Sequence, residues 1–417
     1  MYNVEYLIAH RTAQSDRSSR SSVMTRIAVI TVALGVAAIL LTLAVVRGFR
    51  REMYADLRGF NADISIVDVA TLSGSESLLP YSEALVGRCA AIEGVESIAP
   101  YVVVGGMAKC GDNVLGLQIK GIDATYDTSW WQSRLVEGVL PDFKAEQRGR
   151  EILLSRSTAS QLEVGVGDKV EMLFVEGSSR PRRDAFKVVG LYHTGLEEMD
   201  RAMALGDVRD VRRVASVSSD EVSGYDVVVA NVDKAELIAE ALDEEIFVEA
   251  QSDDSYISTL AATLQQRHPI IFDWMKAHTV IARAVIIIMM VVLLFNMAAA
   301  MLIMVFDRIG MIGALKAQGM RSSAIRRVFL YRAAILFVRG AAWGNAIGGV
   351  AVVVQALWQP VKLNPTGYML SVLPVSVEAS WWVILNVATL VATVAVMVLP
   401  SAMVARIRPE ESLKYKL

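Results

Sequence analysis

The chain has 417 residues, of which 54% are hydrophobic and 20% are charged, and its formal net charge is −3. The hydrophobic fraction is too high for an ordinary soluble protein, and the charged fraction is too high for a protein lying wholly within a membrane. The basic residues are spread over several segments rather than gathered in one patch, so we expect no nucleic-acid partner.

Four apolar segments follow one another along the chain, at Ile27–Val46, Val280–Phe306, Ala333–Leu357 and Trp381–Val404. A helix of about 20 apolar residues crosses the ~30 Å hydrocarbon core of a bilayer, so each segment predicts a transmembrane helix. A long polar stretch separates the first segment from the second. The predicted fold class is an α-helical membrane protein with four transmembrane helices plus a large α+β extracytoplasmic domain.

Arginine and lysine are concentrated in the segments 1–26, 307–332 and 405–417, whereas 358–380 carries only Lys362. By the positive-inside rule both termini and the 307–332 loop are cytoplasmic, and the segments 47–269 and 358–380 lie outside. The first apolar segment is longer than a signal peptide requires, and Arg47-Gly-Phe-Arg-Arg follows it in place of a cleavage site. We therefore expect a multi-pass membrane protein with an uncleaved first helix, at 27–46.

The segment 47–269 shows the shorter periodicities of a folded domain. Alternation predicts a strand at Ala62–Val69, and Ser82 is placed to cap a helix at Ser82–Ile92. Val95–Ala108 and Val114–Gly121 are predicted to form a hairpin through Gly111-Asp112-Asn113.

A second strand–helix–strand unit is predicted at Tyr225–Ala230, Lys234–Glu245 and Ile246–Ala250. Between the two units lies a more β-rich insert, at about 126–222, so the domain is predicted to be a two-part, porter-like core interrupted by an insert. Cys89 and Cys110 both fall in this domain and either form a disulfide or stay free; the sequence leaves both open.

The segment 270–306 is longer than a membrane span requires. Pro269 suits the first turn of a helix, and the pattern then runs without a breaker to Phe306. Such a helix is roughly 55 Å long, so its first part is predicted to be a stalk beyond the bilayer, and Arg47–Arg58 a second stalk.

The cytoplasmic loop 307–332 contains a predicted short amphipathic helix at Asp307–Met320, ended by Gly319. Ser322 or Ser323 is predicted to cap the following helix, which runs into the span 333–357. Two interpretations of the short helix stand: a helix lying at the lipid interface, or a docking element for a cytoplasmic partner.

This short helix resembles the coupling helix of permeases in the MacB/FtsX-like group of ABC transporters. The matching residues are Ile312, Leu315, Lys316, Ala317 and Gly319, whereas Met311 stands where many members have glutamate. Ile119-Lys-Gly-Ile-Asp123, Leu363-Asn-Pro-Thr-Gly-Tyr368 and Arg408-Pro-Glu-Glu-Ser-Leu413 resemble the lipoprotein-releasing branch, of the LolC/LolE type. The resemblance covers essentially the whole chain.

The resemblance implies a non-catalytic permease subunit of the inner membrane, with two permease subunits, alike or different, on a cytoplasmic ATPase dimer. Consistently, no G-x-x-x-x-G-K-[ST] phosphate loop occurs, so ATP and Mg are expected on the partner and no cofactor on this chain. The transported lipoprotein, held among membrane lipids, would pass to a periplasmic chaperone. The alternative is a permease of the same group serving another envelope process, such as efflux of small molecules or peptides, or control of a cell-wall hydrolase.

The resemblance also implies three sets of site residues. The docking helix comprises Arg308, Ile309, Met311, Ile312, Leu315, Lys316 and Gly319; the acyl-chain cavity comprises Val36, Leu40, Leu43, Ile287, Met290 and Leu294; the chaperone-contact loop comprises Ser178, Arg180, Pro181 and Arg182.

Polar residues inside the spans are interpreted as structural. Asn345 and Asn386 are predicted to hydrogen-bond helices together, and Gly344, Gly348 and Gly349 to allow close helix packing. A membrane hydrolase is disfavoured, since the four histidines are scattered and no H-E-x-x-H or Gly-x-Ser-x-Gly motif occurs.

Overall fold

The computed structural model describes residues 20–75, 77–145, 148–174, 182–363, 370 and 372–402, and side chains from Thr25 onward. It divides into two compact units. The helical unit takes its described residues from Met1–Arg51, Met275–Val361 and Leu373–Leu417, and the α/β unit from Glu52–Trp274 and Lys362–Val372.

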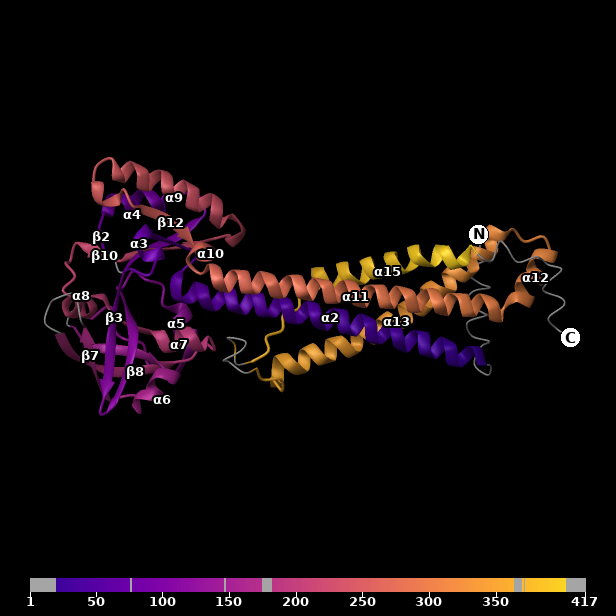
Figure 1. Cartoon of the computed structure of the whole chain (residues 1–417), viewed down its shortest axis with the longest axis horizontal. Coiled ribbons are helices and arrows are strands. Elements are labelled where there is room, and N and C mark those ends of the chain that lie inside the picture. The colour runs from indigo at the N-terminus through magenta and orange to yellow at the C-terminus, as the bar shows by residue number, and fades with distance from the viewer. Residues whose placement is uncertain are drawn as a thin grey trace. The chain divides into compact units, whose positions relative to one another are not determined.

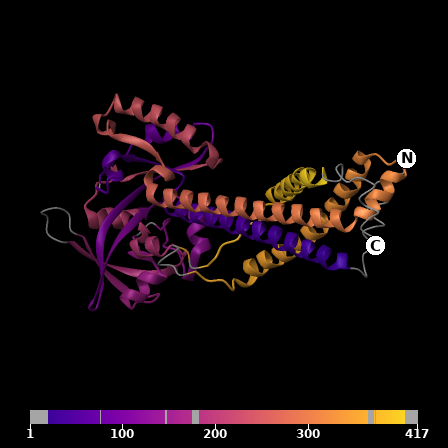
Figure 2. The ribbon, with the colours of Figure 1, turned by 45° about the vertical axis from the view of Figure 1, so that its right-hand side comes forward.

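The helical unit is built on long helices that lie side by side in both ribbon views (Figures 1 and 2). Four helices of the described chain are long and apolar enough to cross a membrane, which confirms the predicted number of spans. They are α2 (Arg20–Asn61), α11 (Pro269–Asp307), α13 (Ser322–Trp358) and α15 (Ala379–Ser401), with the short helix α12 (Ile309–Ala317) between α11 and α13.

Glycines in α13 let it approach α2 closely. A Cβ added to Gly344 would lie 2.7 Å from the carbonyl oxygen of Ala33, and one added to Gly340 would lie 2.6 Å from Cβ of Val32. These distances leave no room for a side chain, so the prediction of close helix packing at Gly344 is confirmed. The bundle core then fills with Val32, Val36, Leu40, Leu293, Met297, Met301, Phe329, Phe337 and Met397.

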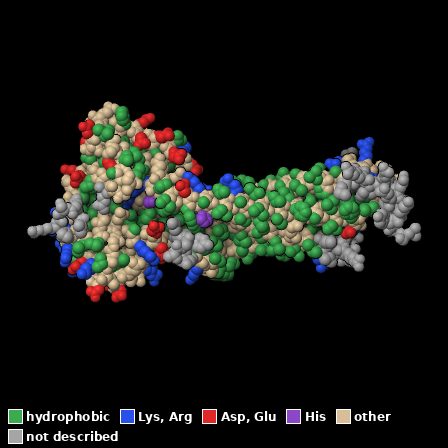
Figure 3. All heavy atoms as spheres, in the orientation of Figure 1, with side chains coloured by type: hydrophobic (Ala, Val, Ile, Leu, Met, Phe, Trp, Pro, Cys, Tyr) green, Lys and Arg blue, Asp and Glu red, His purple; other side chains and the backbone are tan. Residues whose placement is uncertain are grey.

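The outer surface of the helical unit is apolar. Phe295 is 74% exposed and Leu399 is 76% exposed. Figure 3 shows hydrophobic side chains covering the visible face of the bundle, whereas charged side chains gather on the α/β unit. Exposed apolar side chains in such number suit contact with lipid rather than water.

The α/β unit contains one large mixed sheet in the strand order β12-β1-β11-β3-β4-β9-β6-β8-β5, with β7 paired to both β3 and β8. The pairs β4–β9 and β6–β8 are parallel, and the other pairs of the sheet are antiparallel. Its strands are β1 (Ile64–Asp68), β3 (Val95–Cys110), β4 (Asn113–Ile122), β5 (Leu135–Gly138), β6 (Glu151–Ser155), β7 (Lys169–Phe174), β8 (Arg182–Tyr192), β9 (Met203–Asp207), β11 (Gly224–Val229) and β12 (Thr259–Thr263). A separate two-stranded sheet pairs β2 (Leu79–Pro80) with β10 (Glu221–Val222).

The short helices of this unit are α3 (Val69–Leu72), α4 (Glu83–Ala90), α5 (Ser129–Arg134), α6 (Arg156–Leu162), α7 (Glu197–Ala202), α8 (Val208–Ala215), η2 (Val232–Lys234), α9 (Ala235–Ala250), η3 (Asp254–Tyr256) and α10 (Leu264–Arg267). Two hydrophobic cores result. One is formed by residues between Ile64 and Ile98 and between Val222 and Ala261, and the other by residues between Val102 and Val217.

Several elements that were predicted from local sequence signals are present in the structure. The Ser82 side chain accepts a hydrogen bond from the backbone N–H of Leu85 at the start of α4, as predicted for a cap. β3 and β4 form the predicted hairpin, with Gly111 at a φ of +59° in its turn. Both cysteines are free: Cys89 packs in one hydrophobic core and Cys110 against the other.

Two predictions were wrong. Ile246–Ala250 is not a strand but the last part of α9, because Ile238, Leu242 and Ile246 are buried at a spacing of four residues. The strand that follows is β12, which pairs with β1. Neither Ser322 nor Ser323 caps α13; its N-cap is Arg321, whose carbonyl accepts the first helical hydrogen bonds without a side-chain cap.

Candidate functional site

Helix α12 ends as its glycine predicts. Gly319 has a φ of +86°, and the N–H of Met320 donates to the carbonyl of Leu315 at 3.0 Å. The N–H of Gly319 donates to the carbonyl of Lys316, also at 3.0 Å. This pair of bonds is the Schellman arrangement, which requires a left-handed residue and satisfies the last helical carbonyls.

The two faces of α12 differ in chemistry. Ile312 is fully buried, and Met311 and Leu315 pack against the core of the bundle. Ile309, Lys316 and the preceding Arg308 are half-buried. The exposed positions within the helix are Gly310, Ala314 and Ala317, which follow the helical repeat. A partner approaching α12 therefore meets a face of small residues, while the larger apolar residues hold the helix to the bundle.

The predicted cavity residues of α2 lie against α13. Val36 and Leu40 are 3% and 2% exposed, and their side chains contact the positions of Gly344 and Gly348. Leu43, one turn further along, is half-buried. Val36 and Leu40 thus belong to the packed core of the bundle in this arrangement, and Leu43 keeps an accessible surface.

The predicted cavity residues of α11 are more accessible. Ile287 is 56% exposed, and Met290 and Leu294 are half-buried. Leu294 also packs against the bundle core. Ile287 and Met290 therefore have free apolar surface on the outside of the bundle.

The predicted chaperone-contact loop connects β7 to β8. Ser178, Arg180 and Pro181 lie outside the described residues. Arg182 is the first residue of β8; it is exposed and pairs across the two strands with Phe174.

A polar cluster joins α13 to α15 inside the bundle. The side-chain amides of Asn345 and Asn386 donate to one another's oxygen at 2.8 and 3.0 Å. The indole N–H of Trp382 also donates to the amide oxygen of Asn345. The structural interpretation of these asparagines is confirmed, since each of these part-buried hydrogen bonds crosses from α13 to α15.

The last turns of α2 form part of the α/β unit. Met53, Leu57 and Phe60 are fully buried there. The guanidinium of Arg134, on α5, donates to the carboxylates of Asp56 at 2.5 Å and Glu52 at 2.9 Å. No local pattern in the sequence predicts this anchor, because it joins residues about 80 positions apart.

A buried ion pair lies next to that anchor. The ammonium of Lys120 donates to the carboxylate of Asp226 at 2.5 Å, to Phe60 O at 2.7 Å and to Tyr126 Oη at 2.9 Å. The side chains of Lys120 and Asp226 are 3% and 2% exposed. Burial lowers the pKa of Lys120, an effect that the carboxylate of Asp226 opposes. The pair ties the end of α2 to β4 and β11.

Comparison with known proteins matches both parts of the chain. The MacB-like periplasmic core domain family matches residues 25–245, and the FtsX-like permease C-terminal family matches residues 283–409.

Three curated relatives align along nearly their whole length. The lipoprotein-releasing system transmembrane protein LolC of Neisseria meningitidis serogroup B is 24% identical over 100% of both chains. The LolC of Xylella fastidiosa strain Temecula1 is 23% identical over 99% of this chain and 98% of its own. The LolE of Haemophilus influenzae is 20% identical over 94% of both chains.

Proposed function

The chain belongs to the family with a MacB-like periplasmic core domain, and from that membership we propose that it is the permease subunit of an ABC transporter that releases lipoproteins from the inner membrane. The observation that carries the proposal is the alignment, from end to end, with a protein named as a transmembrane component of a lipoprotein-releasing system. Four apolar helices and the α/β unit between the first two accord with it.

In this proposal a separate ATPase dimer supplies the energy. At about 0.8 kcal/mol per buried methylene, several acyl chains do not leave a bilayer without a coupled energy source. The ATPase and its Mg-bound ATP would lie in the cytoplasm with both termini of this chain, and the α/β unit would lie in the periplasm. A second permease subunit completes the assembly, and a periplasmic chaperone receives the lipoprotein.

The proposed path of force enters through α12 and leaves through α2 and α11. The exposed small residues of α12 offer close approach to an ATPase groove, and its larger apolar residues would pass the movement to the bundle. Asp56 and Phe60 of α2, held by Arg134 and by burial, make the end of that helix rigid within the α/β unit. This rigidity supports transmission along the helix rather than bending at its end.

Co-purification from detergent tests the proposal. A tagged full-length chain should bring down an ATPase subunit together with acylated proteins. An ATPase without acylated proteins would favour another envelope process, and the absence of any ATPase would overturn the proposal.

A substitution on α12 tests the docking face. Ala314→Asp puts a charge on the exposed face and should reduce ATPase recovery at least tenfold without loss of membrane insertion. Ala90→Asp makes the same change on an exposed position of α4 and should leave recovery unchanged. Equal recovery from both variants would show that the exposed face of α12 is not the docking surface.

A further inference from the structure

We propose that the α/β unit binds a single-chain anionic amphiphile, an apolar chain bearing one carboxylate or phosphate, in a cavity lined by residues between Phe60 and His268. The cavity has a volume of about 500 Å³. That volume lies within the range of about 300–1,000 Å³ typical of small-molecule sites. The proposal goes beyond the transport of lipoproteins and does not depend on it.

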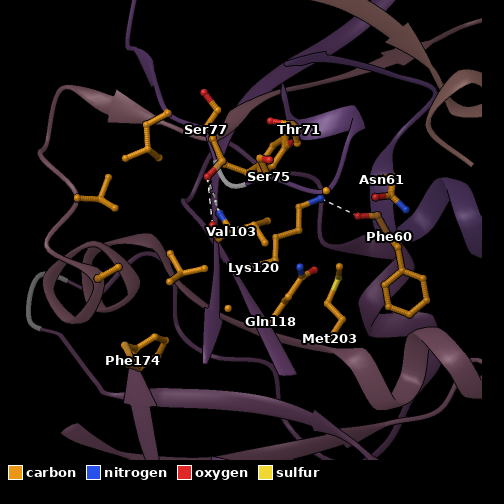
Figure 4. Close-up of a pocket in the computed structure, with 18 of the residues that line it drawn as sticks. Phe60, Asn61, Thr71, Ser75, Ser77, Val103, Gln118, Lys120, Phe174 and Met203 are labelled. Carbon is orange, nitrogen blue, oxygen red and sulfur yellow. Dashed lines mark hydrogen bonds between the residues drawn. The ribbon is translucent and has the colours of Figure 1, made fainter. Parts of the chain in front are cut away.

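The cavity has two unlike walls. Figure 4 shows the hydroxyl groups of Thr71, Ser75 and Ser77 on one side, and Phe174, Gln118 and Met203 on the other. The apolar part of the lining includes Phe60, Leu78, Phe174, Met199, Met203 and Val217. An apolar lining with a few polar groups is the usual composition of a ligand pocket.

The charge of the lining is positive. Lys120, Arg182 and Arg267 line the cavity, and none of its described lining residues is an aspartate or a glutamate. The charge of Lys120 is already balanced by Asp226. The excess therefore rests on Arg267 and Arg182, neither of which forms an ion pair within the described residues.

Arg267 is the stronger of the two candidates for an anion ligand. It is half-buried; its Nη1 donates to Oγ of Ser65 at 2.7 Å, and the hydroxyl of Tyr101 is a second neighbour of the guanidinium. A guanidinium has five N–H donors in a planar fork that matches carboxylate and phosphate oxygens. Arg267 thus has donors to spare in a partly desolvated position, where a charge-assisted hydrogen bond is strong.

Unsatisfied polar atoms around the cavity point to a missing partner. Thr71 Oγ1 and His268 Nε2 are buried, and each lacks a hydrogen-bond partner in the described part of the chain. Both residues line the cavity. Buried polar atoms of native proteins are almost always paired, so two orphans around one cavity indicate a ligand or water that completes them.

The cavity borders the end of α2 and the start of α11. Phe60 and Asn61 are the last residues of α2, and Arg267 and His268 directly precede Pro269, the first residue of α11. An occupant therefore contacts the points at which both long helices end in the α/β unit. Its binding should slow hydrogen exchange at these junctions.

Photolabelling of the full chain in lipid nanodiscs tests the site. A diazirine-bearing fatty acid should label peptides containing Phe174, Met199 or Met203, with labelling of the membrane helices as the internal reference. Unlabelled laurate or lysophosphatidic acid should compete, and the better competitor identifies the head group as carboxylate or phosphate. Inorganic phosphate and neutral monolaurin should not compete. Competition by either of these compounds would show that the ligand is not a single-chain anionic amphiphile.

Two cavity variants of different kinds, with one control variant outside the cavity, separate loss of the site from loss of the fold. Arg267→Gln should reduce labelling of the cavity peptides about tenfold, the loss expected for one charge-assisted contact of at least ~1.4 kcal/mol. Gln118→Trp should occupy part of the cavity and reduce labelling by a similar factor. Arg213→Gln, which changes an exposed arginine of α8 outside the cavity, should have no effect. Unchanged labelling in both cavity variants, or labelling confined to the membrane helices, would overturn the proposal.

Discussion

Replacing Lys120 with methionine should open the α/β unit where α2 meets its sheet. The ammonium of Lys120 joins Phe60 O, Tyr126 Oη and the carboxylate of Asp226, which come from different parts of the chain. Methionine fills much the same volume without the charge. The substitution therefore leaves the Asp226 carboxylate, 2% exposed, without its counter-ion.

The size of the destabilisation depends on which hydrogen bonds the Asp226 carboxylate keeps in the variant. Breaking a buried ion pair by removing one partner costs about 3–5 kcal/mol. Asp226 still accepts hydrogen bonds from Ser65 Oγ at 2.9 Å and from Tyr126 Oη at 2.7 Å. These bonds stabilise the remaining charge, so we expect the lower end, about 3 kcal/mol, which is more than a hundredfold in the opening equilibrium.

Hydrogen exchange measures this directly in the full chain, because it reports the opening free energy of single elements without requiring a two-state transition of the whole protein. Amides of β4 and β11 should exchange more than a hundredfold faster in Lys120→Met. Lys109→Met, at an exposed position of β3, is the control. The double variant Lys120→Met, Asp226→Asn should recover at least half of the opening free energy that the single variant loses. A change below 1 kcal/mol in the single variant, or no recovery in the double variant, would refute the reasoning.

Three further predictions concern the rest of the chain. Burial lowers the pKa of His268 to about 4, so the α/β unit should be fully stable above pH 6.5 and lose up to about 1.4 kcal/mol per pH unit as the pH falls from 6.5 towards 4. Hydrogen-exchange rates measured at several pH values check this, and His268→Gln should abolish this dependence of stability on pH. Gly344→Ala should lower the melting temperature in detergent, because its Cβ would lie 2.7 Å from a carbonyl oxygen; Gly349→Ala, whose Cβ has no neighbour closer than 3.7 Å, should not. Asn345→Leu should cost about 1 kcal/mol by leaving the amide oxygen of Asn386 and the indole N–H of Trp382 without their partner, and a melting temperature equal to that of the unchanged protein would contradict this.

The elements predicted correctly are those whose signals are local. A span is defined by the length of its apolar run, α4 by its serine cap, α12 by Gly319, and the β3–β4 hairpin by a glycine turn. Each of these signals acts over a few neighbouring residues or one continuous run, so no other part of the fold is needed to interpret it.

The sequence by itself therefore determined the four membrane helices, the large unit between the first two and the family to which the chain belongs. The tertiary structure alone decided that Ile246 continues a helix, that Val36 packs against Gly344, and that Lys120 meets Asp226. It also assembled the cavity, whose lining comes from segments between Phe60 and His268. These features depend on which faces meet after long loops have closed, and the pairing of distant faces has no signature in the local spacing of residues.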